Sequence, residues 1–198
     1  RVFMDFDHPA TRRVFHWDLA RCGEVVASRL DDVDDDARRN LIQHMLDHYL
    51  RVTAPRLATL RSSVIHSDGR DYNVLASPEG RWGNRVTGLI DFGDCCYNPA
   101  ICDLAICLAY LMMRGAEPLP IAVAVSEGYQ EVRALAAEEL TVLYPLICAR
   151  LAVSLCVAME RKAIDPSNPN WFGGEESAWR LLRQLRALGP DEFTKGLR

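Results

Sequence analysis

Apolar residues recur at helical spacing in the first third of the chain, between residues 37 and 54. The apolar positions are Leu41, Met45, Tyr49 and Val52. Residues three or four apart lie on one face of a helix, so this spacing predicts an amphipathic helix that Pro55 closes or kinks. An acidic run at 31–36 precedes the segment, and the partial positive charge of a helix N-terminus favours anions there.

The pattern then changes to that of β-strands. Residues 64–77 and 84–92 are rich in β-branched and apolar residues, and the sequence PEGRWG, with its proline and glycines, separates them. Two such segments around a turn predict a β-hairpin with its own preceding loop.

Helical spacing returns from Pro99 onward. It continues through residues 100–113, 121–135, 139–163 and 175–188, with a proline-marked break at 117–120 and a loop at 165–174. The chain has no internal repeat, no low-complexity tract and no linker. The sequence therefore predicts a single, mainly α (α+β) domain over residues 1–198, helical with a small β-hairpin.

The charge is nearly balanced, with 23 Lys and Arg residues against 27 Asp and Glu residues and a formal net charge of −4. Both signs are scattered along the chain, which argues against a general nucleic-acid binder. The longest uninterrupted apolar run, Leu104 to Met113, is shorter than the roughly 18 residues of a membrane span. The first residues lack both the apolar core of a secretory signal and an initiator Met, so we expect a piece of a longer protein.

The cysteines number seven, and no two form a C-x-x-C pair. A disulfide framework or a zinc site requires cysteines at characteristic spacings. Four of them lie between Cys95 and Cys107, and the last three of these lie in or beside an apolar stretch, where a reduced cysteine packs as a small hydrophobic residue. We therefore expect packing instead of metal binding, and a reducing, cytoplasmic compartment.

One part of the chain combines the groups that phosphoryl transfer requires. I-H-S-D-G-R-D-Y-N-V-L and, after the hairpin, G-L-I-D-F-G-D place His66, Asp68, Asn73 and Asp91 in order. A carboxylate can orient an acceptor hydroxyl group and take its proton, and hard oxygen ligands hold the Mg²⁺ of a nucleoside triphosphate. Each residue alone has a plainer role, as a core histidine, a turn cap or a strand end. Together, around a hairpin, they predict a kinase-like site.

This order resembles the protein-kinase pattern H-R-D-x-x-x-x-N followed by D-F-G, with Ser67 in place of the arginine. A small residue there is typical of the aminoglycoside phosphotransferase and choline kinase superfamily, which the chain resembles. HSDGRDYNVL, GLIDFGD and ICDLAICLAY are most similar to the hydroxylysine-kinase-like group, including the phosphotransferase domain that is fused to class-III aminotransferases. The resemblance covers nearly the whole chain and is most specific at the two motifs.

The resemblance implies a role for each motif residue. Asp68 would be the catalytic base that orients the acceptor hydroxyl group. Asn73 and Asp91 would be Mg²⁺ ligands, with ATP or GTP as the co-substrate. His66 would brace the catalytic loop.

Two further aspartates are implied to support the site. Asp103 resembles the family's buried aspartate that holds the catalytic-loop backbone from the following helix, although the first turn of a helix favours aspartate in any case. Asp94 lies three residues after Asp91. For Asp94, contact with metal, with substrate or with a backbone amide all stay open.

Kinases of this superfamily also have a smaller lobe, with a glycine-rich loop over the phosphates and a strand lysine. The glycine clusters of this chain, at 80/83 and 173/174, follow the catalytic loop instead of preceding it. We therefore expect a protein-kinase-like C-terminal (catalytic) lobe without its N-terminal nucleotide-binding lobe, inactive by itself.

The sequence thus predicts a small-molecule kinase that transfers the γ-phosphoryl group of Mg-ATP or Mg-GTP to a hydroxyl group of an amino alcohol, a hydroxy amino acid or an aminoglycoside. The alternative is a non-catalytic kinase-like module that docks or regulates a fused enzyme such as an aminotransferase, although a scaffold has no use for Asp68, Asn73 and Asp91 together. A third interpretation is a metal-dependent hydrolase built on H-x-D. His44 and His48 have helical spacing but lack the glutamate of H-E-x-x-H.

The residues that choose the acceptor would lie in the helical region after the hairpin, and the sequence singles out none of them. The polar and aromatic candidates are Tyr110, Glu127, Tyr129, Arg150, Glu160, Trp171 and Trp179. Acidic residues among them would suit an ammonium-bearing acceptor.

Overall fold

The computed structural model describes residues 5–33, 35–79, 85–168 and 173–198. The α-helices are α1 (Cys22–Ala27), α2 (Asp36–His48), α3 (Ile101–Arg114), α4 (Pro118–Gln130), α5 (Ala137–Ile164), α6 (Glu175–Leu188) and α7 (Pro190–Gly196). Short 3-10 segments cover residues 9–12, 19–21, 30–32, 54–59, 71–73 and 92–94. The predicted mainly helical fold with a small β-hairpin is confirmed.

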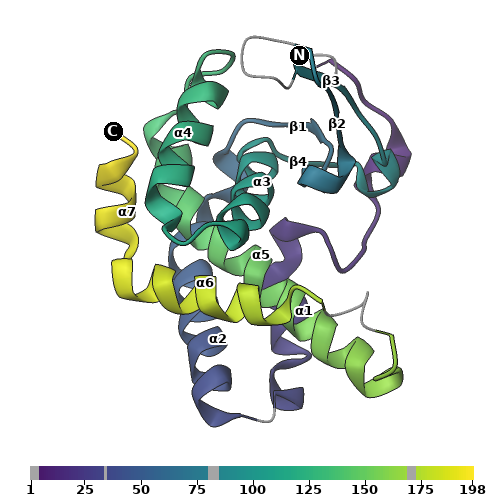
Figure 1. The fold of residues 1–198 in the computed structure, drawn as a ribbon, viewed down its shortest axis with the longest axis vertical. Coiled ribbons are helices and arrows are strands. Elements are labelled where there is room, and N and C mark those ends of the chain that lie inside the picture. Colours follow the sequence, from purple (N-terminus) through teal and green to yellow (C-terminus); the bar gives the residue numbers. More distant parts are fainter. Residues whose placement is uncertain (1–4, 34, 80–84, 169–172) are drawn as a thin grey trace.

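Helix α5 runs through the centre of the molecule, and α1, α2, α3, α6 and α7 all pack against it (Figure 1). Its side chains from Val142 to Val153 are all buried, so it needs neighbours on every side. By length and composition α5 could cross a membrane, but 89% of its most apolar window is buried inside the protein. The surrounding helices therefore cover its apolar surface.

Short strands form two antiparallel pairs within the described residues. β1 (Ser62–Ile65) pairs with β4 (Cys96–Pro99), and β2 (Val74–Ser77) pairs with β3 (Arg85–Leu89). The second pair lies within the chain segment that the first pair closes, because β1 precedes it and β4 follows it.

This nesting brings the two chemical motifs together. Residues 66–73 lead from β1 into β2, and residues 90–95 lead from β3 into β4. The backbone N–H of Ile90 donates to the carbonyl oxygen of Asn73 at 2.9 Å, which joins the two segments directly. The predicted hairpin is confirmed by the pairing of β2 with β3, and most of its turn, at 78–83, lies outside the described residues.

Strand β4 is the main departure from the sequence prediction. Helix α3 begins at Ile101, not at Pro99, because residues 96–99 extend along β1. A strand of four residues is too short for alternation to reveal it. Helices α1 and α7, of six and seven residues, are also too short for a periodic pattern.

The helix predicted over residues 37–54 is α2 together with an altered continuation. Asp35 caps its N-terminus, with a carboxylate oxygen 2.8 Å from the backbone nitrogen three residues on. After α2 the backbone widens into a π-helical turn at Tyr49–Thr53 and tightens into a 3-10 segment at Ala54–Thr59. Pro55 lies where the tighter segment starts, and proline has no N–H to continue the α-helical hydrogen bonds.

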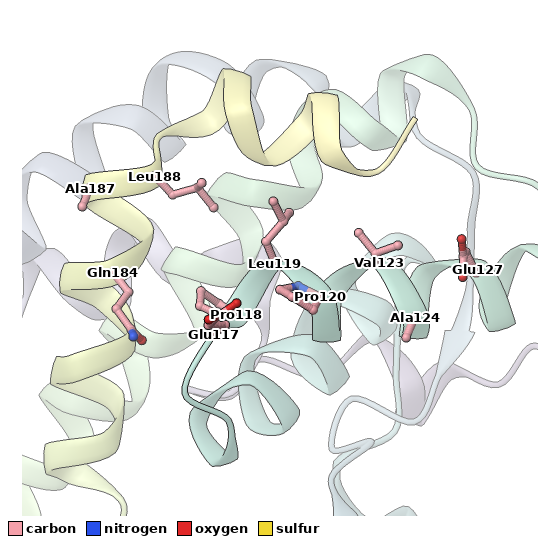
Figure 2. Close-up of a pocket in the computed structure, with 10 residues that line it drawn as sticks. All are labelled: Glu117, Pro118, Leu119, Pro120, Val123, Ala124, Glu127, Gln184, Ala187 and Leu188. Atoms are coloured by element: carbon pink, nitrogen blue, oxygen red, sulfur yellow. The ribbon is translucent and has the colours of Figure 1, made fainter.

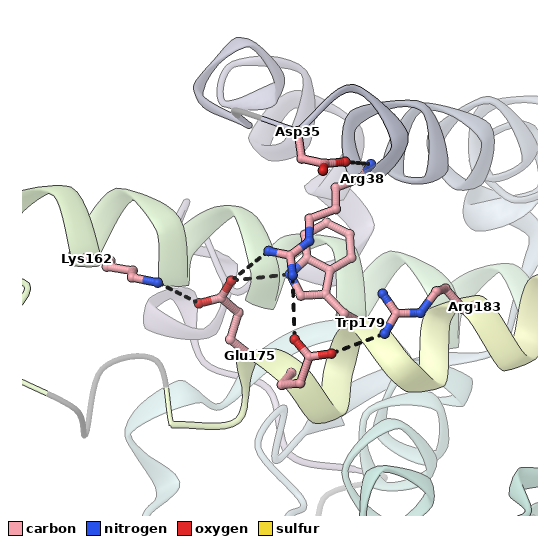
Figure 3. Close-up of polar contacts among 7 residues, drawn as sticks. Asp35, Arg38, Lys162, Glu175, Trp179 and Arg183 are labelled. Atoms are coloured by element: carbon pink, nitrogen blue, oxygen red, sulfur yellow. Dashed lines mark hydrogen bonds and ion pairs between the residues drawn. The ribbon is translucent and has the colours of Figure 1, made fainter.

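A polar cluster ties α2, α5 and α6 together (Figure 3). Glu175, in the first turn of α6, lies 3.4 Å from Arg38 of α2 and 3.6 Å from Lys162 of α5. The indole N–H of Trp179 also donates to Glu175, at 3.3 Å. Trp179 is one of the candidates for acceptor recognition, but its side chain is fully buried and packs in the core.

All seven cysteines are free thiols. The buried ones are Cys22, Cys96, Cys102, Cys148 and Cys156. Burial raises the pKa of Cys95 and of Cys107 to about 11, which keeps both thiols protonated near neutral pH. The prediction that the cysteines pack as small hydrophobic residues is confirmed for the five buried ones.

Candidate active site

Asp103, in the first turn of α3, holds the backbone at the start of the candidate catalytic loop. Its carboxylate accepts the backbone N–H groups of His66, at 3.2 Å, and Ser67, at 2.9 Å, one on each oxygen. Burial raises the pKa of Asp103, although the two N–H donors lower it. Helix α3 therefore fixes the point at which the loop leaves β1.

The His66 ring connects this loop to the second motif. Its Nδ1 accepts the backbone N–H of Asp68 at 3.3 Å, and its Nε2 lies 3.0 Å from the carbonyl oxygen of Ile90. Only the neutral tautomer with its proton on Nε2 satisfies both contacts. The side chain is 2% exposed, and its ring packs edge-on against Phe92. His66 thus braces the two motifs from inside the protein.

Asn73 fixes the orientation of Asp68. Its amide nitrogen donates to the carbonyl oxygen of Asp68 at 2.9 Å and to Oδ2 of the same residue at 2.8 Å. Since the amide hydrogens point at Asp68, the Oδ1 of Asn73 is turned away from it, and no group in the described residues donates to that oxygen. The Asp68 side chain is 17% exposed, so a small molecule can reach its carboxylate.

Ser67 and Asp91 both have a left-handed backbone, with φ of 65° in each case. This conformation costs a non-glycine residue about 1–2 kcal/mol, and it persists only where the surroundings enforce it. Each residue lies two positions after a strand, where the chain turns sharply out of β1 or β3. The hydrogen bond from the Ser67 N–H to Asp103 is one of the contacts that hold the first turn.

Asp91 and Asp94 add negative charge near Asp68. Burial raises the pKa of Asp94, and the charges of Asp68 and Asp91 raise it further. Arg150 and then Arg13 offset part of this effect by lowering the pKa of Asp94. The guanidinium of Arg13 lies 3.9 Å from Asp94 and also donates to the carbonyl oxygen of Gly93. The site therefore gathers three interacting carboxylates, which together favour a bound cation.

The donors that suit Mg²⁺ are the Oδ1 of Asn73 and the carboxylate of Asp91. Both are hard oxygen ligands, and Mg²⁺ is usually held by one or two carboxylates together with substrate phosphates and water. Across the described ranges, no three His, Cys, Asp or Glu side chains converge on a common point. Gly93 leaves room for the Asp91 carboxylate, because a Cβ there would lie 3.2 Å from Oδ1. The donor set fits a Mg²⁺ ion that arrives with a nucleotide, and it offers no zinc centre for a hydrolase.

Arg150 of α5, one of the polar candidates for acceptor recognition, lies beside Asp68, a contact that the sequence did not predict. Its Nη2 lies 3.5 Å from the Oδ1 of Asp68 and donates to the Tyr110 hydroxyl oxygen at 2.9 Å. Its guanidinium lies 4.6 Å from the centre of the Trp17 ring. Helical periodicity places residue 150 among the apolar positions of a buried helix, so the pattern gives no signal for a charged contact with the loop.

Other candidates for acceptor recognition lie in structural positions or outside the described residues. Glu160 pairs with Arg29 at 2.9 Å, which ties α5 to the segment after α1. Tyr129 packs against the core as a partly buried side chain. Trp171 is among the residues that the structure does not describe.

Glu127 lines a shallow groove of about 850 Å³ between α4 and α6 (Figure 2). The groove is lined mainly by apolar side chains, among them Leu119, Val123 and Leu188. None of the motif residues contributes to it. The groove is therefore separate from the candidate catalytic loop.

Residues 3–138 match the family described as the phosphotransferase enzyme family. The chain is 28% identical to the hydroxylysine kinase of Danio rerio, over 98% of this chain and 56% of that protein. It is 25% identical to the hydroxylysine kinase of Mus musculus, over 96% of this chain and 52% of that protein. It is 33% identical to the homoserine kinase of Sinorhizobium fredii, over 61% of this chain and 34% of that protein. The chain thus spans about half the length of the hydroxylysine kinases that it matches.

Replacing Ser67 with glycine should stabilise the protein by about 1 kcal/mol, because glycine adopts the left-handed backbone without the steric cost. For a chain of this size, the melting temperature should rise by roughly 2–4 °C in thermal unfolding followed by circular dichroism. Ser63→Gly is the matched control, since Ser63 lies in β1 without a positive φ and the change should destabilise the protein by roughly 0.5–1 kcal/mol. A lower melting temperature for both variants would contradict strain at Ser67.

The loss in free energy of unfolding caused by Asp103→Asn should depend on pH. The pKa of Asp103 is higher in the folded than in the unfolded protein, so the wild-type free energy of unfolding falls as pH rises from about 4 through the folded pKa. Asparagine does not titrate, so the stability difference between wild type and variant should narrow over that range. Urea unfolding at a series of pH values measures the difference. If the stability difference between wild type and variant instead widens as pH rises, the two N–H donors lower the pKa of Asp103 by more than burial raises it.

Proposed function

The chain belongs to the phosphotransferase enzyme family, and we propose that it is the catalytic lobe of a small-molecule kinase. In this proposal the γ-phosphoryl group of Mg-ATP or Mg-GTP is transferred to a hydroxyl group of the acceptor. The observation that carries the proposal is the hydrogen bond from Asn73 to the Oδ2 of Asp68. This bond leaves the Oδ1 of Asp68 for an acceptor hydroxyl group and the Oδ1 of Asn73 for a metal ion. A scaffold has no need of this arrangement.

Asp68 is the proposed base. Its Oδ2 is held by Asn73, so an acceptor hydroxyl group donates to Oδ1, which orients the hydroxyl oxygen and accepts its proton as the new O–P bond forms. His66 and Asp103 act through the backbone, because both bond the main chain around Ser67 and Asp68. Their role is to keep the carboxylate in one position.

Asn73 and Asp91 are the proposed magnesium ligands, with Asp94 as a third negative group beside them. Bound Mg²⁺ would neutralise charge on the transferring phosphoryl group. Burial is the main cause of the raised pKa of Asp94, and the charges of Asp68 and Asp91 raise it further, so a divalent cation would relieve the repulsion among the three carboxylates.

The proposed acceptor class is a small hydroxyl compound of the amino alcohol, hydroxy amino acid or aminoglycoside type. Support comes from the names of two relatives, a hydroxylysine kinase and a homoserine kinase. We also propose a cytoplasmic location, since all seven cysteines are free thiols, as expected in a reducing compartment.

Asp68→Asn in the intact protein should lower kcat by roughly 10²- to 10⁴-fold, because asparagine cannot accept the hydroxyl proton. Release of nucleoside diphosphate is measured with Mg²⁺, ATP or GTP, and a panel of amino alcohols, hydroxy amino acids and aminoglycosides. Asp71→Asn is the matched control, because Asp71 lies in the same loop but pairs with Arg114 at the surface. Its rate should stay within about two-fold of wild type.

An unchanged rate for Asp68→Asn would remove Asp68 from the mechanism. Absence of turnover in the wild type, together with absence of nucleotide binding, would favour the non-catalytic docking module instead.

Asp91→Asn should raise the Mg²⁺ concentration needed for half-maximal activity by roughly 10-fold or more, because a neutral amide binds Mg²⁺ more weakly than a carboxylate. Binding of Mn²⁺ in the presence of nucleotide, followed by electron paramagnetic resonance, gives a second measurement that needs no turnover. Gly93→Ala should change both quantities in the same direction, since its Cβ would press on the Asp91 carboxylate. Unchanged Mn²⁺ affinity in Asp91→Asn would exclude Asp91 as a ligand.

A further inference from the structure

Arg150 is a buried arginine whose hydrogen-bond donors the described residues satisfy only in part. Its side chain is 3% exposed, and both Nε and Nη1 lack any hydrogen-bond partner in that part of the chain. Three of its N–H bonds, two on Nη1 and one on Nε, therefore have no acceptor. Buried guanidinium groups are normally paired and hydrogen-bonded, because removing a charge from water is costly. The unsatisfied donors point to an anion that the folded chain does not supply.

The guanidinium with these unsatisfied donors lies beside the atom at which an acceptor would react. Asn73 occupies Oδ2 of Asp68, so Oδ1 is the oxygen left for an acceptor hydroxyl group. The Nη2 of Arg150 lies 3.5 Å from that same Oδ1, a single long contact that leaves most of the guanidinium unused. A molecule whose hydroxyl group donates to Oδ1 therefore places its remaining groups next to Arg150.

The side chain is also held in place for recognition. Trp17 covers one face of the guanidinium at 4.6 Å, and the Tyr110 hydroxyl group accepts from Nη2 at 2.9 Å. Stacking occupies the face, whereas the N–H bonds lie in the plane of the group and can still donate. The guanidinium of Arg70 lies 4.8 Å from the centre of the Tyr110 ring. The Nε of Arg70 is a further buried donor without an acceptor in the described chain.

A second arginine lies close to Arg150. The Arg70 guanidinium lies 4.8 Å and the Arg150 guanidinium 5.4 Å from the centre of the same Tyr110 ring. Arg150 also lowers the pKa of Asp94, but the hydrogen-bond donors on its Nε and Nη1 have no acceptor in the described chain. An acceptor with an anionic group would satisfy those donors, whereas a purely cationic acceptor would not.

We propose that Arg150 binds a carboxylate of the acceptor, which makes the acceptor a hydroxy acid or hydroxy amino acid and not an amino alcohol or an aminoglycoside. The proposal rests on the proposed kinase function, because Asp68 defines where the acceptor hydroxyl group lies. Arginine suits this task because its planar N–H groups match the geometry of a carboxylate. A phosphate oxygen of the nucleotide is the other anion with this chemistry, and the experiment separates the two.

The test compares matched acceptors that differ only by the carboxylate: homoserine against aminopropanol, and hydroxylysine against diaminopentanol. In the wild type, kcat/KM should favour the carboxylate-bearing member of a pair. Arg150→Met should reduce that preference by roughly 10- to 100-fold, the value of a hydrogen bond to a charged group. Arg150→Lys should restore part of it.

Arg161→Met is the matched control. Arg161 lies on the same helix and contacts the same Trp17 ring, at 5.8 Å, but makes no contact with Asp68 in the described structure. Its substitution should leave the preference between paired acceptors unchanged. Circular dichroism melting curves for each variant establish that it is folded.

Two kinetic outcomes would overturn the proposal. If the wild-type kcat/KM shows no preference for carboxylate-bearing acceptors, Arg150 does not bind the acceptor's carboxylate. If Arg150→Met lowers kcat/KM equally for both members of a pair, then Arg150 acts on Asp68 or on the phosphates of the nucleotide. Either result leaves the proposed kinase function intact.

Calorimetric titration of the same acceptors with nucleotide present separates failure of this proposal from failure of the proposed function. Binding of the carboxylate-bearing member that depends on Arg150, without turnover, would reject the kinase and keep the carboxylate site. Absence of both binding and turnover for every pair would reject the carboxylate site.

Discussion

The position of the candidate catalytic loop depends on the carboxylate of Asp103. It accepts the N–H groups of two consecutive residues, His66 and Ser67, and so determines how the chain leaves β1. This anchor is needed because a two-stranded sheet is marginal in water, and among the described residues β1 pairs with β4 alone. Helix α3 supplies the carboxylate and packs on α5, the helix that most of the others also contact. The helical core thus sets the geometry of a loop that its own strands could not hold.

The parts of the site that the sequence predicted are those whose partners are close in the chain. Asn73 and Asp68 are five residues apart, so their contact is carried by the motif spacing itself. Asp91 follows a hairpin whose two segments show a clear β pattern. Strand β4 and the contact between Arg150 and Asp68 could not be predicted in this way. The first is four residues long, and the second joins residues 82 positions apart, one of them on a helix with apolar residues on every side.

The left-handed backbone of Ser67 and Asp91 could not be predicted from the sequence, for a different reason. A serine at position 67 is compatible with ordinary backbone, and only the folded chain reveals its left-handed φ. The same holds for Asp91, which follows β3 in a run of residues that reads as strand. In both cases tertiary contacts override local preference at the ends of strands, and residues of the two chemical motifs are the ones that carry the strain. Strain of this kind is expected where a chain must place particular side chains at a functional site.

The two carboxylate oxygens of Asp68 have different partners. Its Oδ2 accepts from the amide of Asn73, and its Oδ1 faces the guanidinium of Arg150. In the proposed kinase this difference would matter, because the phosphoryl donor and the acceptor hydroxyl group approach from opposite sides, roughly in line. Asn73 and Asp91 would hold the metal of the donor, and the Oδ1 of Asp68, beside Arg150, would receive the acceptor. The same contacts restrain the proposed base, since a carboxylate bonded on one oxygen and paired on the other has little freedom to rotate.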